Sequence, residues 1–503
     1  MSVEETILYA VLTPLVGAGL IAVTGSRPNL REAVTLASGV VLFVLVADLY
    51  PLVAAGQRPS VDMMEMLPGL TISFTVEPLG MIFAGIASFL WIVTSIYSIG
   101  YMRGHDEQNQ TRFYVFFAVA ISASIGIAFA GNMLTLFLFY EVLTLSTFPL
   151  VTHNGTDEAR RAGRVYLGIL MGTSILFLLF AIIWTWFLTG TLDFTPGGIL
   201  AGKADGLPAA ILFGLYMFGI GKAALMPFHR WLPAAMVAPT PVSALLHAVA
   251  VVKAGVFAVV KVIVYIFGVE TLTREFSSGW LLYVAGFTII VASVIALRSD
   301  NLKRRLAYST ISQLSYVVLA AAILSPISVM GAAFHIAAHA FGKITLFFAA
   351  GSIMVASNKT LVSQLDGIGR RMPWTMGAFF IGALSMIGLP PTAGFVSKWY
   401  ILTGAFEAGQ MAAVAVIVLS TLLNAGYFLP IVYAAFFRKD PTAKALAAGA
   451  KGKGKKHAPR VEHGEAPVFI VIALIITAAG TVALFLFPDG PLGLARQLMG
   501  GAP

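Results

Sequence analysis

The most regular feature of the sequence is a succession of long apolar stretches separated by short polar connections. Each stretch has roughly 20 residues, which is the length an α-helix needs to cross about 30 Å of hydrocarbon. The pattern predicts about fourteen membrane-spanning helices. We place them at residues 6–24, 33–54, 78–101, 112–130, 132–151, 165–189, 208–235, 241–267, 280–298, 308–324, 327–355, 373–405, 411–437 and 467–487.

Composition supports the same class. Apolar residues make up 58% of the 503 positions and charged residues only 11%, whereas a soluble domain has about 25% charged residues. We therefore expect an all-α polytopic membrane protein. The first apolar stretch follows Glu4 and Glu5 instead of a basic segment, so it is predicted to be a span and not a signal peptide. The chain has no cysteine, which excludes disulfides, iron–sulfur clusters and thiolate metal sites within it.

Basic residues are divided unevenly between alternate connections. One set of connections holds 23 of the 32 lysines and arginines, including eight in residues 438–460, and the opposite set holds Arg58, Lys203, Arg274 and Arg496. The positive-inside rule makes the first set cytoplasmic and puts both termini outside. The net charge of +9 is then an orientation signal and gives no reason to expect nucleic acid as a partner. The basic segment 438–465 is interpreted as a solvated cytoplasmic linker, with a site for a partner or anionic lipid as the alternative.

The five remaining basic residues fall inside predicted spans. They are Lys222, Lys253, Lys261, Lys343 and Lys398. A lysine at mid-bilayer costs roughly 2.5–3.5 kcal/mol on insertion scales, so these side chains should face protein or water. A lysine that snorkels to the interface is the alternative, and it is as well supported as a functional role for Lys261.

Glu141 is the only acid predicted well inside a span, because Asp48 and Glu77 lie near predicted ends. A buried carboxylate needs a basic partner, and we expect Lys222 to be that partner. Opening such a pair would favour release of the lysine proton, so the pair could act as a switch.

Histidines extend this set of titratable groups. His335, His339 and Lys343 are spaced i, i+4 and i+8 on one helix face, and His247 and Lys253 share another span. Core histidines bonded to carbonyls are the alternative. We expect no metal and no cofactor, since no suitable carboxylate accompanies the histidines and one helix face cannot flank a haem iron. Every base that we expect to be deeply buried is lysine or histidine, which can exchange protons as arginine cannot.

Prolines interrupt two predicted spans beside these lysines. Pro227 follows Lys222, and Pro390 and Pro391 precede Lys398, which predicts discontinuous helices beside hydrated cavities in spans 7 and 12. Opposed broken helices are typical of inverted-repeat transporters. We therefore predict two inverted five-helix repeats, spans 4–8 and 9–13. The expected organisation is a three-helix segment (1–110), the first repeat (111–268), the second repeat (269–437), a basic cytoplasmic loop (438–466) and a C-terminal helix (467–503).

Three stretches carry a resemblance to a known family. FYEVLTLSTFPLV, GKAALMPFHRWLPAAMVAPTPVSALLHAVAVVKAGVF and HAFGKITLFF resemble the antiporter-like subunits shared by respiratory complex I and Mrp-type cation/proton antiporters, from about residue 75 to 435. The resemblance implies fourteen helices, two inverted half-channels and a central line of proton-carrying residues. By motif match the implied line consists of Glu141, Lys222, Lys253, His335, His339, Lys343 and Lys398. We add His247 to the candidate site because it is a further titratable group in the span of Lys253.

The D-type Mrp subunit is the most similar member of that family, since Lys398 replaces the glutamate of one complex I subunit. The resemblance implies a proton-translocating subunit of a multisubunit Na⁺/H⁺ antiporter in the bacterial cytoplasmic (inner) membrane. Its implied partners are the other subunits, H⁺, Na⁺ and membrane lipids. It would be part of a secondary transporter. The alternative is a proton-pumping subunit of a complex I-type or hydrogenase-type redox enzyme, which would also hold no redox centre in this chain.

Overall fold

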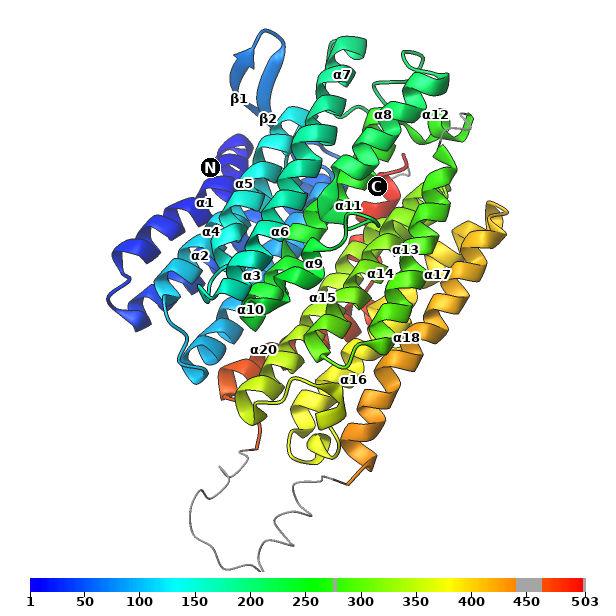
Figure 1. The fold of residues 1–503 in the computed structure, drawn as a ribbon. Helices are drawn as coiled ribbons and strands as arrows, with labels where there is room; N and C mark the ends of the chain where they lie inside the picture. The colour runs from blue at the N-terminus through cyan, green and yellow to red at the C-terminus, as the bar shows by residue number, and fades with distance from the viewer. Residues whose placement is uncertain (275–277, 440–463, 501–503) are drawn as a thin grey trace, which may run out of the picture.

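The protein is a bundle of long, roughly parallel helices in a computed structural model that describes residues 1–274, 278–439 and 464–500 (Figure 1). The helices are α1 Val3–Val23, α2 Pro28–Ala54, α3 Pro78–Gly104, α4 Gln110–Ala128, α5 Met133–Val151, α6 Asp157–Thr173, α7 Leu179–Thr189, α8 Gly206–Gly219, α9 Trp231–Ala234, α10 Thr240–Ala244, α11 Val251–Lys261, α12 Val269–Arg274, α13 Trp280–Arg298, α14 Leu302–Ala322, α15 Pro326–Ser357, α16 Pro373–Ile387, α17 Ala393–Glu407, α18 Met411–Phe437, α20 Val468–Leu486 and α21 Asp489–Gln497.

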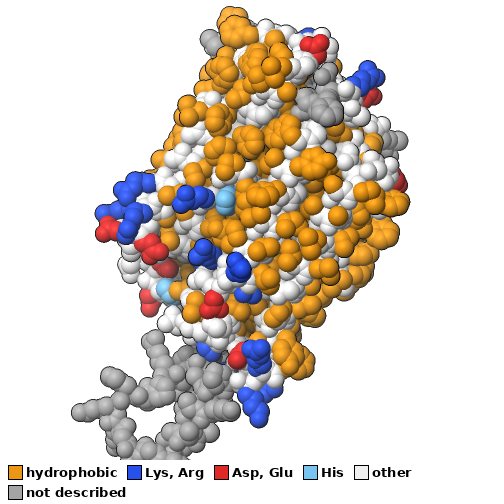
Figure 2. Space-filling model, turned by 45° about the vertical axis from the view of Figure 1, so that its right-hand side comes forward, with side chains coloured by type: hydrophobic (Ala, Val, Ile, Leu, Met, Phe, Trp, Pro, Cys, Tyr) orange, Lys and Arg blue, Asp and Glu red, His pale blue; other side chains and the backbone are white. Residues whose placement is uncertain are grey.

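Eleven helices within the described ranges are long and apolar enough to cross a membrane, and Gly206–Gly219 and Pro373–Ile387 are shorter apolar helices. Large apolar side chains also cover much of the outer surface (Figure 2), as a lipid-facing perimeter requires. The expectation of a helical polytopic membrane protein is confirmed. The total of about fourteen spans and the two inverted repeats stay predictions.

Both chain termini lie toward the same end of the bundle (Figure 1). This end also carries β1 (Ser60–Leu67) and β2 (Leu70–Thr75), and we call it the hairpin end. Helices α2 and α20 begin, and α3 and α18 end, at the opposite end, which we call the basic end because Lys and Arg side chains gather toward it (Figure 2). Which end faces the cytoplasm stays a prediction. The predicted basic loop 438–466 lies outside the described residues from 440 to 463.

The β-hairpin was not predicted from the apolar pattern. Strands β1 and β2 pair antiparallel across Pro68 and Gly69, a Pro-Gly turn between strands that could have been recognised. The Ser73 amide donates to Thr135 Oγ1 at 3.1 Å and the Thr75 amide to the Phe129 carbonyl at 2.7 Å. The hairpin is thus bound to α5 and to the end of α4, and it continues directly into Glu77 and α3.

The predicted helix 208–235 is discontinuous, as expected, but the break is not where the sequence placed it. Helix α8 ends at Gly219, and the 3₁₀ turn η2 (Gly221–Ala223) contains Lys222, so this lysine lies within the break and not before it. A side chain at Gly221 would place its Cβ 2.2 Å from Thr173 Oγ1, so the backbone packs tightly against α6. Trp231 Nε1 donates to the Gly221 carbonyl at 3.0 Å and satisfies one group freed by the break.

The second predicted break is confirmed. Helix α16 ends at Ile387, Gly388 adopts a φ of +90°, and α17 begins at Ala393, five residues before Lys398. The Lys398 ammonium donates to the carbonyls of Met386 at 2.8 Å and Ile387 at 3.1 Å. The lysine therefore binds the carbonyls that the end of α16 leaves without helical partners.

The span Thr240–Phe267 lies at the centre of the bundle, and the most apolar part of it is completely buried. It is divided into α10, the π-helical turn η4 (Leu245–Val249), α11 and a second π-helical turn, η5 (Val262–Phe267). Turns of this kind inside helices are frequent at functional sites. Here η4 contains His247 and η5 begins directly after Lys261.

Candidate functional site

A line of buried titratable side chains joins three helices near the middle of the bundle. Lys253 Nζ of α11 contacts His339 Nδ1 of α15, and both residues are buried. One turn earlier on α15, the ring of His335 lies 6.1 Å from that of His339, between centroids. His335 Nδ1 is 2.8 Å from Ser397 Oγ of α17. The sequence predicted that these residues would be buried, and the structure brings them together.

The line continues to Lys398, which follows Ser397 directly. The ring of Tyr316, from α14, lies 5.8 Å from His335 and 4.5 Å from the ammonium of Lys398. A cation near an aromatic face is stabilised by the ring. Lys253, His339, His335 and Lys398 therefore form a nearly continuous polar route from α11 to the break before α17, which we call the central line.

Lys343 leads away from the central line to a different pair of helices. Its ammonium donates to Ser309 Oγ of α14 at 2.8 Å, and Tyr427 of α18 donates to the same hydroxyl at 3.1 Å. The Tyr427 hydroxyl also contacts the side chain of Asn424. The three residues predicted to share one face of α15 thus bind three different elements, and Lys343 opens a branch toward α18.

Lys222 is held by α5. Its ammonium donates to the Tyr140 carbonyl at 2.8 Å and to Thr144 Oγ1 at 2.6 Å, and it lies 3.1 Å from the centre of the Tyr140 ring. A Cβ at Gly255 would lie 2.3 Å from the Lys222 carbonyl carbon. Helix α11, which carries Lys253, therefore packs directly on the backbone of Lys222.

The expected ion pair between Glu141 and Lys222 is not formed. The described residues contain no N–O contact within 4 Å between these two side chains, and both Glu141 carboxylate oxygens are buried without a hydrogen-bond partner. Lys222 instead binds the carbonyl of Tyr140, which immediately precedes Glu141 in α5. The acid and the base are neighbours, but the amine satisfies its donors on the backbone and on Thr144.

His247 is buried in η4 but is not hydrogen-bonded to the central line. Neither ring nitrogen has a partner among the described residues, and the ring lies 4.7 Å from that of Phe347. His335 Nε2 and His339 Nε2 are also buried without a partner. Unpartnered buried polar atoms are rare in proteins and usually bind water, so their concentration here indicates a hydrated or proton-binding region.

Sequence reasoning missed one buried ion pair, between Glu77 and Lys261. The Lys261 side chain is 1% exposed and the Glu77 side chain 8% exposed, so the interpretation of Lys261 as a snorkelling residue is wrong. The two residues are separated by 184 positions. The signal that could have suggested the pair is an acid directly before Pro78, at the entry to an apolar span.

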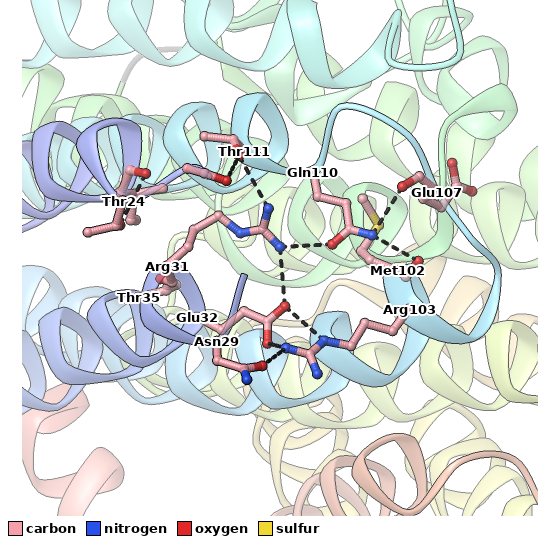
Figure 3. A network of polar contacts seen from close by, with 12 residues as sticks. Thr24, Asn29, Arg31, Glu32, Thr35, Met102, Arg103, Glu107, Gln110 and Thr111 are labelled. Carbon is pink, nitrogen blue, oxygen red and sulfur yellow. Dashed lines mark hydrogen bonds and ion pairs between the residues drawn. The ribbon is translucent and has the colours of Figure 1, made fainter. Parts of the chain in front are cut away.

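Arginines are also buried, at the basic end, which corrects the expectation that every buried base is lysine or histidine. Arg31 donates to Gln110 Oε1 at 2.9 Å and approaches Glu32 Oε1 at 3.2 Å, and Arg103 pairs with Glu32 as well (Figure 3). We call Arg31, Glu32 and Arg103 the arginine network. Arg305 is the second case, with Nη1 donating to the Tyr427 carbonyl at 2.9 Å.

Comparison with known proteins places this geometry in a family. A family profile described as "NADH:quinone oxidoreductase/Mrp antiporter, TM" matches residues 130–424, and another, "NADH-Ubiquinone oxidoreductase (complex I), chain 5 N-terminus", matches residues 68–114. The NADH-quinone oxidoreductase subunit N of Desulforudis audaxviator is 32% identical over 429 residues, which cover 84% of this chain and 83% of that relative.

A second relative is longer. A protein of Rhizobium meliloti that is named as a component of a probable K⁺/H⁺ antiporter is 30% identical over 87% of this chain, which spans only 45% of that protein. A chain in the structure of the Mrp complex from Dietzia sp. superposes with a TM-score of 0.86 at 22% identity and covers 100% of this chain and 98% of its own length. At this identity the superposition shows a shared fold. From the matched profile and the first relative, we conclude that the chain belongs to the family of membrane subunits shared by NADH:quinone oxidoreductases and Mrp antiporters.

Proposed function

We propose that this chain is a proton-translocating, antiporter-like subunit of a multisubunit membrane complex. The observation that carries the proposal is the central line, in which Lys253, His339, His335 and Lys398 succeed one another through the buried middle of the bundle. Ionisable residues at membrane depth are expensive to keep and generally mark ion or proton pathways. Lysine and histidine can both gain and lose protons, so a line built of them can pass a proton from one group to the next.

Lys222 and Glu141 are proposed to control entry to this line. In the described arrangement Lys222 binds Tyr140 and Thr144, while the Glu141 carboxylate beside it has no partner. Rotation of the lysine toward Glu141 would pair the charges, and rotation back would leave the ammonium without its counter-charge. The second state favours release of the proton toward Lys253, because an isolated buried charge is costly. His247 and Lys343 would be additional proton-binding groups beside the same route.

For the host complex we propose an Mrp-type antiporter in the bacterial inner membrane that exchanges Na⁺ and contains this chain as its D-type subunit. Both termini would lie outside, and the two five-helix repeats would each form a half-channel. Lys398, in place of the glutamate of one complex I subunit, supports this choice, as does the superposition on a chain of an Mrp complex.

A second candidate host is a redox-driven proton pump, in which the same chain would move protons without exchanging Na⁺. The relative at 32% identity, named as part of an NADH-quinone oxidoreductase, favours it. The central line would have the same role in either host, so the hosts differ in what drives the line and not in its chemistry.

The test uses inverted membrane vesicles that contain the complete complex. In the antiporter, added Na⁺ should dissipate a pre-formed ΔpH, and Lys222→Ala should abolish this response. In the redox pump, Na⁺ should have no effect and an electron donor such as NADH should instead build a ΔpH. Normal rates with Lys222→Ala in both assays would overturn the proposed function.

A further inference from the structure

The Glu77–Lys261 pair lies outside the proposed route and is built from side chains with unusual surroundings. The Lys261 ammonium lies 3.7 Å from the centre of the Phe194 ring and 4.7 Å from that of Tyr265, in addition to its contact with Glu77. These contacts stabilise the charged ammonium. The site is therefore a box of aromatic rings closed by one carboxylate.

The pair is linked to the central line through α11. Lys253 and Lys261 are eight residues apart on one continuous helix, which corresponds to about 12 Å along the axis and about 80° around it. Phe257 lies between them, with its ring centre 5.8 Å from the Lys261 ammonium and 5.4 Å from the ring of Phe83. Phe257 is four residues from each lysine along α11.

A polar cavity lies at the hairpin end, near the end of the span that carries Lys261. The cavity has a volume of about 730 Å³, and Val264, three residues after Lys261, is part of its wall. Its rim includes the side chains of Lys203, Asp205 and Arg274, all exposed to solvent. Water can therefore reach to within one helical turn of Lys261.

The backbone between Lys261 and this cavity is not an ordinary α-helix. The π-helical turn η5 occupies Val262–Phe267, and the connection before α8 crosses its end, with the Ile199 amide donating to the Tyr265 carbonyl at 3.2 Å. A π-turn widens the helix and weakens its hydrogen bonds.

We propose that Glu77 and Lys261 form a second proton-exchange site, through which the route from Lys253 opens to the cavity at the hairpin end. The inference rests on the proposed function and adds to it an opening of the proton route to the cavity, which we call the port. The Lys261 ammonium transfers its proton to the Glu77 carboxylate, which leaves a neutral amine and a carboxylic acid. The acid then releases the proton to water, and the amine takes up the next proton from Lys253 when Phe257 rotates aside.

A buried ion pair can also exist only to fix the fold, but its composition here argues against that role alone. Replacing a buried pair by apolar residues of similar volume is often neutral or stabilising. Where this protein needs a fixed charge, in the arginine network, it uses a base that keeps its proton. At position 261 it uses the base that can release one.

The test compares charge-conserving variants in vesicles that contain the complete complex. Lys261→Arg keeps the ion pair but cannot release its proton, so transport should fall by about tenfold or more, which is less than the about 100-fold expected when a proton-transfer group is removed together with its charge. Glu77→Asp should retain part of the activity and Glu77→Gln should lose it. Arg103→Lys, in the arginine network, is the matched control and should transport normally. Wild-type rates with Lys261→Arg would overturn the proposal.

A second measurement decides the matter if Lys261→Arg does not assemble. The chain has no cysteine, so Val264→Cys introduces a unique thiol at the wall of the cavity. In vesicles whose hairpin end faces the medium, a charged, membrane-impermeant thiol reagent should label it and inhibit transport, while the same reagent should leave complexes with the wild-type chain active. Labelling without inhibition, or failure to label, would overturn the port. If Lys222→Ala also transports normally, the proposed function fails as well, and the two failures are thereby distinguished.

Discussion

At the basic end of the bundle, Glu32 pairs with two arginines, whereas in the middle Lys253 contacts a histidine and no acid among the described residues. Both clusters are largely buried, and both join helices that are distant in sequence. They differ in the chemistry of the base. Arginine remains protonated at any physiological pH, so the first cluster is a permanent charge with a permanent partner. Lysine and histidine can lose their protons, so the second cluster can change its charge.

The two clusters also differ in how completely their atoms are satisfied. In the arginine network Arg31 donates to Gln110 and Thr111, and Arg103 donates to Asn29, in addition to their contacts with Glu32 (Figure 3). In the central line, ring nitrogens of His335 and His339 have no partner among the described residues. Arg31 Nε also lacks a partner among the described residues, but a guanidinium nitrogen keeps its proton, whereas an unpartnered ring nitrogen of a histidine can accept one.

The largest expected effect is on transport when the middle of the central line is removed. Lys253→Met leaves a side chain of similar size but removes the protonatable group that contacts His339. Transport in vesicles should fall by about 100-fold or more, the range found for loss of a proton-transfer group. Arg103→Met is the control in the arginine network and should transport normally per assembled complex. Equal losses of transport in Lys253→Met and Arg103→Met would contradict the proposed difference between the central line and the arginine network.

Exchanging lysine for arginine in the central line, and arginine for lysine in the arginine network, should have smaller effects. Only the first exchange should reduce transport. Lys253→Arg keeps a positive charge in the central line but blocks proton release, so transport should fall by about tenfold. Arg31→Lys keeps a positive charge in the network but loses the second of its paired donors, so only stability should fall. The measurements are the ΔpH response and the thermal midpoint of the purified complex. A Lys253→Arg variant with normal transport would show that charge alone matters at this position.

Removing the acid of the network should affect stability and not transport. Glu32→Gln leaves Arg31 and Arg103 without their counter-charge, and the loss of a charged hydrogen-bonded partner costs about 1.5–3 kcal/mol. We expect a lower thermal midpoint in detergent and an unchanged transport rate per folded complex. A slower rate in the folded fraction would mean that the network is coupled to the line.

The smallest expected effect is a dependence of stability on pH near the basic end. Burial, and then the charge of Arg112, lower the pKa of His153, which lies in the connection after α5. The folded state therefore favours the neutral ring. Its contribution is fully present above the unfolded pKa of about 6.5 and is lost as the pH falls below it. The thermal midpoint should drop between pH 7 and pH 5, and His153→Gln should reduce this drop by on the order of 1 °C.

Much of the fold could be predicted because its signals are local. Apolar length predicted the helices, and Pro390 with Pro391 predicted the second break, since both depend on residues adjacent in the chain. The first break lies at Lys222 and not after it, because its position depends on the tight contact between Gly221 and Thr173. These residues are distant in sequence, so the apolar pattern does not predict their contact. The β-hairpin was missed because its short strands stand between two much longer apolar signals.

The candidate site could be predicted only as a set of buried groups. Sequence identified Lys253 and His339 as buried, but their contact joins positions 86 residues apart. For the same reason it could not find the partner of Lys261, and it expected Glu141 to pair where Lys222 binds backbone and hydroxyl oxygens instead. Partner choice depends on three-dimensional placement, which the apolar pattern does not contain.

Gly255 limits how this protein can move. Its missing side chain leaves room for the backbone of η2, whereas the flanking residues Ala254 and Val256 each carry a Cβ. A shift of α11 by one residue along η2 would drive one of these carbons into the Lys222 peptide. The two segments therefore keep a fixed register. We expect proton transfer at this point to involve rotation of side chains and reorientation of water, without a shift of α11 along η2.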